Sequence, residues 1–282
     1  MVVFWVLLTV AAVASLLVSW GGVRWRSSTR ELLDRLAAAQ RPVTPTAYDP
    51  LELEGLPAPV QRYLRAVLQP RQAMAAAVHV EHTGTFDMGR QRPNWRAFTS
   101  TQRISARPPG FVWDARIRLL PGLGVSVHDA YVAGQGVLRA AVLGLWPVAD
   151  QRGGVDLAVG ELMRYLAEAV WHPTALLPSQ GVRWRGVDER SARATLADGD
   201  VEVSLLFHFD DHGLVDTVSA EARGRLVGAE SVPTPWQGRF WNFAQRSGMR
   251  VPLDGEVAWL LPEGPRPYWR GHITDLAHGF ER

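Results

Sequence analysis

The hydrophobic pattern of the chain changes from a helical period to a strand period near Ala76. Residues 2–20 carry no charge and are almost entirely apolar. Residues 29–40 place Leu32, Leu33 and Leu36 on one helical stripe. After a proline-rich linker, residues 56–68 predict a second short helix, with Pro57 in its first turn.

Beyond Ala76, apolar and polar residues alternate, as in half-buried antiparallel strands. The pattern is clear over residues 111–119 and 201–209, and about eleven such segments follow one another at a spacing of roughly ten residues. Residues 153–171 interrupt them with a long apolar helical face. We therefore predict a mainly β (α+β) fold: a strongly curved antiparallel half-barrel of about eleven strands with one long inserted helix covering its inner face.

The N-terminal segment predicts a transmembrane helix ahead of the two short helices. A helix over residues 2–20 would be about 28 Å long, close to the thickness of the hydrocarbon core. A cleaved signal peptide is the alternative, although no basic residue precedes the apolar run. The expected organisation is an anchor over residues 1–22, a helix and Pro-rich linker over 23–55, and one β-rich domain over 56–282.

The expected partner of residues 2–20 is the membrane, but two orientations are left open. Arg24, Arg26 and Arg30 follow the apolar run and argue for a cytoplasmic domain by the positive-inside rule. The predicted half-barrel is more usual on the opposite, extracytoplasmic side.

The amino-acid composition excludes several kinds of catalytic site and of binding partner. The chain has no Cys and no Lys, so all 30 basic residues are Arg, against 28 Asp and Glu. Disulfides, thiol catalysis and Schiff-base lysines are excluded. Because the arginines are scattered among acidic residues, with a net charge of +2, we expect no nucleic-acid partner. We also expect no cofactor.

His79 and His82 are the candidate pair of metal ligands in the sequence. His79 and His82 lie three positions apart in a predicted strand, which places them on opposite faces. The two histidines therefore cannot bind the same metal ion in that strand. Nor does the sequence place a third metal ligand at a suitable spacing from any pair of histidines. We expect no metal.

Polar residues within apolar patterns are the remaining chemical candidates. His82 and Asp129 lie on otherwise apolar strand faces and need hydrogen-bond partners if buried. Glu168 and His172 lie four residues apart on a helical stripe with Glu161 and Arg164, which we interpret as a solvent-facing ladder of ion pairs. The alternative is a hydrolase that uses Glu168/His172 or His82/Asp129 against a membrane-derived substrate.

The aromatic content points to an apolar binding surface. The chain has 12 Trp, and many of them fall in strand-like segments. Trp is large and seldom fully buried, so a curved sheet rich in Trp favours a surface open to apolar molecules, with a Trp-rich core as the alternative. The predicted ligand-binding residues are His82, Trp113, Asp129, Tyr131, Trp184, Phe207, Trp259 and Trp269.

Four segments carry a family resemblance: residues 111–115, 127–131, 160–168 and 268–271. They resemble a family of membrane-anchored bacterial proteins of unknown function, over about residues 56–280. The order of elements is also similar to the half-barrel of the lipoprotein-localisation (lipoprotein carrier) superfamily. That second resemblance implies an acyl chain held in the concave face.

These observations predict a membrane-anchored, non-catalytic binding protein for a lipid or another hydrophobic ligand. The hydrolase is the first alternative. A structural or interaction module that uses exposed strand edges is the second.

Overall fold

One antiparallel sheet dominates the computed structural model, which describes residues 1–89, 92–228 and 230–280, without the side chains of residues 10, 11 and 14. The sheet is 13-stranded, in the order β6-β5-β4-β3-β2-β1-β13-β12-β11-β10-β9-β8-β7. The first six strands are β1 (Ala75–Asp87), β2 (Trp95–Ser105), β3 (Gly110–Leu120), β4 (Leu123–Val132), β5 (Gln135–Val142) and β6 (Trp146–Arg152). The others are β7 (Arg183–Asp188), β8 (Ser191–Asp198), β9 (Val201–Phe209), β10 (Val215–Val227), β11 (Glu230–Arg246), β12 (Met249–Leu261) and β13 (Gly264–Phe280).

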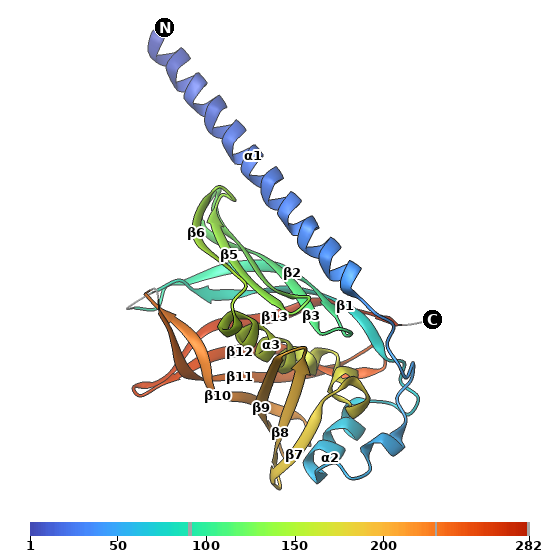
Figure 1. The fold of residues 1–282 in the computed structure, drawn as a ribbon. Helices are drawn as coiled ribbons and strands as arrows, with labels where there is room; N and C mark the ends of the chain where they lie inside the picture. The colour runs from blue at the N-terminus through green and yellow to red at the C-terminus, as the bar shows by residue number, and fades with distance from the viewer. Residues whose placement is uncertain (90–91, 229, 281–282) are drawn as a thin grey trace.

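The sheet curls around helix α3 (Val155–Glu168), which lies in its concavity between the two runs of strands (Figure 1). The curved antiparallel sheet with an inserted helix is therefore confirmed, with thirteen strands in place of about eleven. The edge strands β6 and β7 contain no buried residue in the described structure, so the alternation that signals a half-buried strand is missing from both.

Alternation along β3 and β4 separates the two faces of the sheet. Trp113 lies opposite Asp129 in the β3–β4 register, and Val112 lies opposite Ala130. Trp113 belongs to the main core on the concave side, whereas Val112 and Ala130 pack with Leu32 of the N-terminal helix on the convex side. The alternation of β3 and β4 predicts that this convex face is exposed to solvent. The N-terminal helix covers it along these two strands.

Short helices close one end of the concave side. The 3₁₀ turn η1 (Pro50–Leu53) leads into α2 (Ala58–Val67), which confirms the second short helix predicted from the sequence. After α3, the chain forms three 3₁₀ turns, η2 (Ala169–Trp171), η3 (Pro173–Leu176) and η4 (Pro178–Gln180). Tyr63 and Leu64 of α2 are fully buried in the main core, so this end is packed without a gap for solvent at these side chains.

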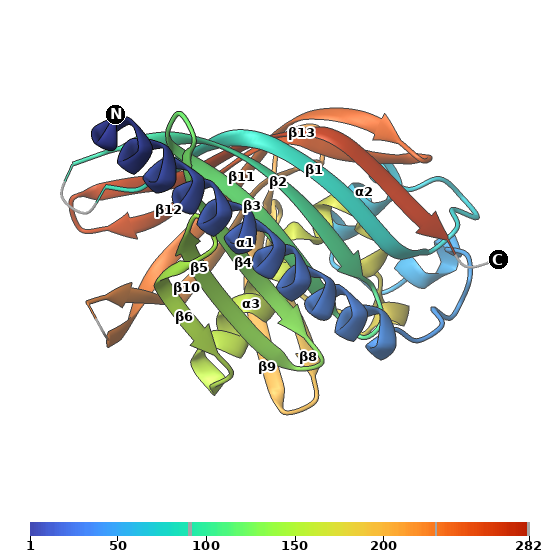
Figure 2. The ribbon, with the colours of Figure 1, turned by 90° about the horizontal axis from the view of Figure 1, so that it is seen from above.

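Helix α1 (Val2–Ala39) is continuous over 38 residues. The predicted anchor and the short helix predicted over residues 29–40 are one element, which corrects their separation. Figure 2 shows α1 crossing the outer face of β3 and β4, which it contacts. Gly21 allows the crossing, because a Cβ there would lie 2.3 Å from the Leu143 carbonyl oxygen.

A polar cluster fixes α1 to the sheet. The Trp25 indole donates to Asp114 Oδ1 at 3.0 Å, and the Thr29 hydroxyl lies 2.9 Å from Asp114 Oδ2 and 2.8 Å from His128 Nε2. The Trp25 and His128 rings stack at 3.9 Å between centroids. Burial lowers the pKa of His128 to about 4, so this imidazole is neutral near pH 7.

The first half of α1 projects beyond the sheet (Figure 1) and exposes apolar side chains. Leu7 is 64% exposed and Leu16 is 70% exposed. Among the described residues, no helix combines the length and the apolar character needed to cross a membrane. The transmembrane helix predicted over residues 2–20 is therefore not supported.

Candidate functional site

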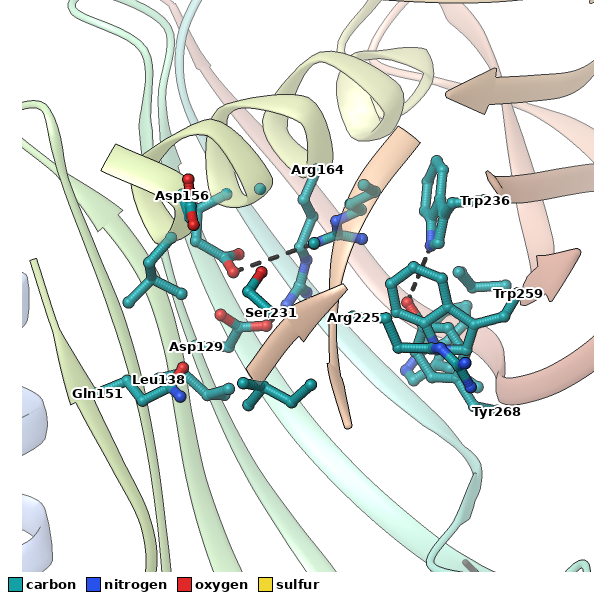
Figure 3. A pocket seen from close by; sticks show the side chains of 18 of the residues that line it. Asp129, Leu138, Gln151, Asp156, Arg164, Arg225, Ser231, Trp236, Trp259 and Tyr268 are labelled. Atoms are coloured by element: carbon teal, nitrogen blue, oxygen red, sulfur yellow. Dashed lines mark hydrogen bonds and ion pairs between the residues drawn. The ribbon is translucent and has the colours of Figure 1, made fainter. Parts of the chain in front are cut away.

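A cavity of about 1400 Å³ lies between α3 and the concave face of the sheet. Its lining comes from one face of α3 with the residues just before it, from Trp171 of η2, from β1 and β3 to β6, and from β10 to β13. Figure 3 shows Arg164 pointing from α3 toward Asp129, with Trp236, Trp259 and Tyr268 grouped elsewhere on the wall. The cavity therefore has a charged part under α3 and an aromatic part on the later strands.

Aromatic side chains of β11, β12 and β13 form a connected wall. The Trp236 indole donates to the Tyr268 hydroxyl at 2.9 Å, and the Tyr268 ring stacks on Trp259 at 5.6 Å. The full aromatic lining is Phe86, Trp113, Trp171, Trp236, Phe240, Trp259, Tyr268 and Trp269. Because these rings present apolar faces held in place by each other, the wall suits an apolar molecule.

Arg164 organises the charged part of the cavity. Its Nε donates to Glu168 Oε1 at 2.7 Å, and its Nη1 donates to Asp129 Oδ2 at 2.6 Å. Gln102 closes the network by donating to Glu168 Oε2 at 2.7 Å. The guanidinium also lies 4.8 Å from the Phe111 ring centre and 5.1 Å from that of Trp113. Two carboxylates and two aromatic faces thus compensate one buried cation.

Glu161 extends this network along α3. It is 5% exposed and lies 3.9 Å from Arg223 of β10. Burial and the neighbouring Asp129 raise its pKa well above the ordinary value, which favours the protonated form of Glu161. Burial lowers the pKa of Arg164, but the carboxylates beside it outweigh that effect and raise the pKa above its usual range. Arg164 therefore stays charged.

This arrangement corrects the interpretation of Glu161, Arg164, Glu168 and His172 as a solvent-facing ladder. The first three face the cavity, because the apolar interior lies on more than one side of α3. His172 lies beyond the helix and is fully buried, and neither ring nitrogen has a hydrogen-bond partner in the described structure. Burial lowers its pKa to about 3. Glu168 and His172 thus form no acid–base pair.

Four of the predicted ligand-binding residues line the cavity. They are Trp113, Asp129, Trp259 and Trp269. Trp113 and Asp129 are cross-strand neighbours on β3 and β4, and Trp269 follows Tyr268 on β13. The strand pattern placed Trp113 and Asp129 on apolar faces and Trp259 and Trp269 in strand-like segments, and the curvature of the sheet brings the four residues to one cavity.

Three other predicted residues lie outside the cavity lining: Tyr131 and Phe207 in the core, and Trp184 half-buried against it. Tyr131 is fully buried, and its hydroxyl donates to Asp198 Oδ2 at 2.9 Å. Trp184 packs edge-on against Phe207 at 5.1 Å and donates its indole N–H to the Leu176 carbonyl at 2.9 Å. None of the three belongs to the cavity lining. An apolar strand face does not distinguish a packed position from an open one.

His82 lies behind the cavity wall. Its ring packs against Trp171 at 5.1 Å and Trp269 at 5.9 Å, and its Nδ1 lies 3.3 Å from the Ser100 hydroxyl. Burial lowers its pKa to about 3, so it is neutral near pH 7. His82 and Asp129 do not pair, since Asp129 binds Arg164. The opposite faces predicted for His79 and His82 are confirmed, because His79 lies beside Glu81 at 3.4 Å.

Several lining residues were not identified from the sequence. Arg223, Arg225 and Trp236 face the cavity from β10 and β11, and Gly160 faces it from α3. An Arg-Gly-Arg run within a strand was the available signal, because it places two cations on one face. Across the described ranges, no group of three His, Cys, Asp or Glu side chains is arranged to hold a metal ion.

The fold and the cavity define a helix-covered, open β half-barrel. The chain belongs to a family of unknown function, DUF6920, whose family model matches residues 54–278. The resemblance to a family of unknown function predicted from the sequence is confirmed. A comparison with the curated proteins finds no match.

Solved structures with similarity to this chain include three bacterial proteins. A LolA superfamily protein from Nitrosomonas europaea has a TM-score of 0.41 and 10% identity, covering 77% of this chain and 90% of its own. A DUF1329 family protein from Desulfovibrio piger has a TM-score of 0.38 and 10% identity, covering 72% and 86%. A β-barrel-like protein of a domain of unknown function, DUF1849, from Brucella abortus has a TM-score of 0.30 and 12% identity, covering 73% and 99%.

Proposed function

We propose that this protein binds a lipid or another hydrophobic molecule in the cavity between α3 and the concave face of the sheet. The observation that carries the proposal is the cavity of about 1400 Å³ with its wall of aromatic side chains. Pockets that hold small molecules commonly have about 300–1,000 Å³. A space of this size inside an otherwise closely packed core suits an elongated apolar guest better than a small polar one.

Apolar burial would supply most of the affinity. Each CH₂ group removed from water contributes about 0.8 kcal/mol, so one acyl chain provides ample free energy even after the cost of immobilising it. The wall of Trp236, Trp259, Tyr268 and Trp269 offers rigid aromatic faces for such a chain. Neither pair of the hydrolase alternative is joined by a contact, so no described geometry favours catalysis by them.

The proposal includes attachment to a membrane surface through α1. The exposed apolar side chains of its first half include Phe4, Trp5, Leu7, Leu16 and Trp20. The second half is fixed to the convex face of the sheet, so such attachment would hold the half-barrel near a source of lipid.

The direct experiment is titration of the purified full chain with a dansylated fatty acid. We expect saturable binding, a blue shift of the dansyl emission and energy transfer from the cavity tryptophans. Replacement of Trp241, which is exposed on β11, by Ala provides a matched control that leaves binding unchanged. Absence of saturable binding would contradict the proposed function.

A further inference from the structure

Two arginines of β10 face the cavity from the same side of the strand. Arg223 and Arg225 are separated by Gly224, and both line the cavity. The Arg223 side chain is only 10% exposed, and its guanidinium lies 5.0 Å from the ring centre of Trp236 on the aromatic wall. A cation therefore lies beside the surface proposed to hold an apolar chain.

Neither arginine donates a hydrogen bond to a carboxylate among the described residues, and Glu161 lies at ion-pair distance from Arg223 only. The nearest acidic oxygen to Arg223 is Glu161 Oε1 at 3.9 Å, which is beyond hydrogen-bond distance. The Arg225 Nε is buried without a hydrogen-bond partner among the described residues. Buried guanidinium groups are costly unless their donors are satisfied.

Most other charges of the lining already have partners. Asp129 and Glu168 bind Arg164, Asp150 binds Arg152, Glu256 binds Arg270, and Asp87 accepts from the backbone of Gly89 and Asn94. Asp156, in the first turn of α3, is the remaining acidic lining residue, and it forms no ion pair with Arg223 or Arg225 within 4.0 Å. Arg266, also in the lining, donates to the Gly89 carbonyl at 2.9 Å. Arg223 and Arg225 thus keep donors that no carboxylate of the described lining accepts.

The raised pKa of Glu161 adds to the excess of positive charge at Arg223 and Arg225. Burial and Asp129 raise its pKa well above the ordinary value, which disfavours the charged form of the carboxyl beside Arg223. The aromatic wall and the two arginines together present one apolar and one cationic surface within the same cavity.

We propose that Arg223 and Arg225 bind the anionic headgroup of an amphiphile, a carboxylate or a phosphate, whose apolar tail lies against the wall of Trp236, Trp259 and Tyr268. This inference rests on the proposed function and names the ligand class. Guanidinium groups present paired donors that match the oxygens of carboxylates and phosphates. The headgroup would supply the acceptors that the two side chains lack.

The test compares ligands with one chain and different headgroups. Dodecanoate, dodecyl phosphate and dodecanol compete for the dansylated fatty acid on the full chain at low ionic strength. We expect the two anions to bind about tenfold more tightly than the alcohol, because charge-assisted hydrogen bonds are about twice as strong as neutral ones. In Arg223→Gln and Arg225→Gln this preference should largely disappear while dodecanol binding is kept. Arg239→Gln, an exposed position on β11, is the matched control and should keep the preference.

The outcomes separate this inference from the proposed function. Equal affinity for dodecanol and the two anions, or a preference that both variants retain, would overturn the inference but leave hydrophobic binding intact. Failure of every dodecyl ligand to bind would overturn both. Inorganic phosphate is also titrated alone by calorimetry. If phosphate binds tightly, Arg225→Gln removes that binding and no dodecyl compound binds, the two arginines form a site for a free anion. That result would overturn the proposal of an amphiphilic ligand.

Discussion

At the scale of single residues, the cavity depends on charges that are buried yet compensated. Asp129 and His82 were identified from the sequence because each interrupts an apolar strand face. The partners of these two residues were not identified from the sequence. Arg164 binds Asp129 although 35 residues separate them in the chain, and His82 contacts Ser100 on a neighbouring strand. Alternation predicts which residues turn inward, but it carries no information about which inward residues meet across the concavity.

Loss of Arg164 should be costly. Arg164→Leu leaves Asp129 and Glu168 without their cation, and removal of one partner of a buried pair typically destabilises by about 3–5 kcal/mol. Urea denaturation measures the change in the free energy of unfolding. The matched variant Arg183→Leu breaks the exposed pair with Glu202 and should cost less than about 1 kcal/mol. Equally small losses for the two variants would contradict a compensated buried charge.

His172 should make stability depend on pH. Its pKa is lowered from 6.5 to about 3 in the folded state, so as the pH falls below 6.5 the unfolded chain binds a proton that the folded chain excludes. Stability contributed by the neutral ring is therefore lost on acidification, and between pH 7 and pH 5 this loss is about 2 kcal/mol. His172→Phe should remove that share of the pH dependence in denaturation experiments. His212→Phe, in the exposed turn after β9, should leave the dependence as in the unsubstituted protein, and an identical profile for all three proteins would refute the assignment.

At the scale of elements, local patterns predicted the helices and the long strands. The strand predicted over residues 201–209 coincides with β9, and the inserted helix falls between β6 and β7. The short edge strands lack a buried face, and α1 continues through Gly21 and Gly22, where the expected anchor over residues 1–22 ends. A glycine pair is equally a site of close approach, and the sequence alone does not distinguish the two uses.

Gly21 and Gly22 make a matched test of how α1 docks. A Cβ at Gly21 would lie 2.3 Å from the Leu143 carbonyl oxygen, whereas at Gly22 it would meet only Arg26 Nη1 at 3.5 Å. Gly22→Ala should stabilise the helix by up to about 1 kcal/mol through propensity, and Gly21→Ala should lift it from the sheet. Hydrogen exchange of residues 21–39 checks this: faster exchange is expected for Gly21→Ala only, and equal exchange in both variants would contradict the docking.

At the scale of the whole molecule, the sequence predicted a curved sheet with an inner helix, and the structure adds the space between them. The core is closely packed around Tyr131 and Phe207 but open at Trp259 and Trp269, although all four lie in strand segments that the sequence predicts. Cavity formation depends on how far α3 lies from each strand, which is set by side chains on both.

Membrane attachment is a property of the whole chain that α1 should control. The double substitution Leu7→Glu and Leu16→Glu places charges on two of its most exposed apolar positions and should abolish co-sedimentation with phospholipid vesicles. Leu51→Glu, at a 67% exposed position of η1, is the control and should leave sedimentation unchanged. Vesicle binding that survives the double substitution would contradict attachment through α1.

Substitution of Gly160 tests most directly whether a hydrophobic ligand occupies the cavity. A Cβ at this position of α3 would meet only Arg223 Nε, at 3.8 Å, so a larger side chain extends into the open cavity. Native mass spectrometry of the gently purified full chain, with titration by the dansylated fatty acid, compares Gly160→Leu with Gly160→Ala. We predict bound lipid and probe binding in the unsubstituted and Ala proteins, and a marked loss of both in a stably folded Leu protein. Unchanged ligand binding in Gly160→Leu, or ligand-free spectra and no probe binding in all three proteins, would contradict a hydrophobic ligand under α3.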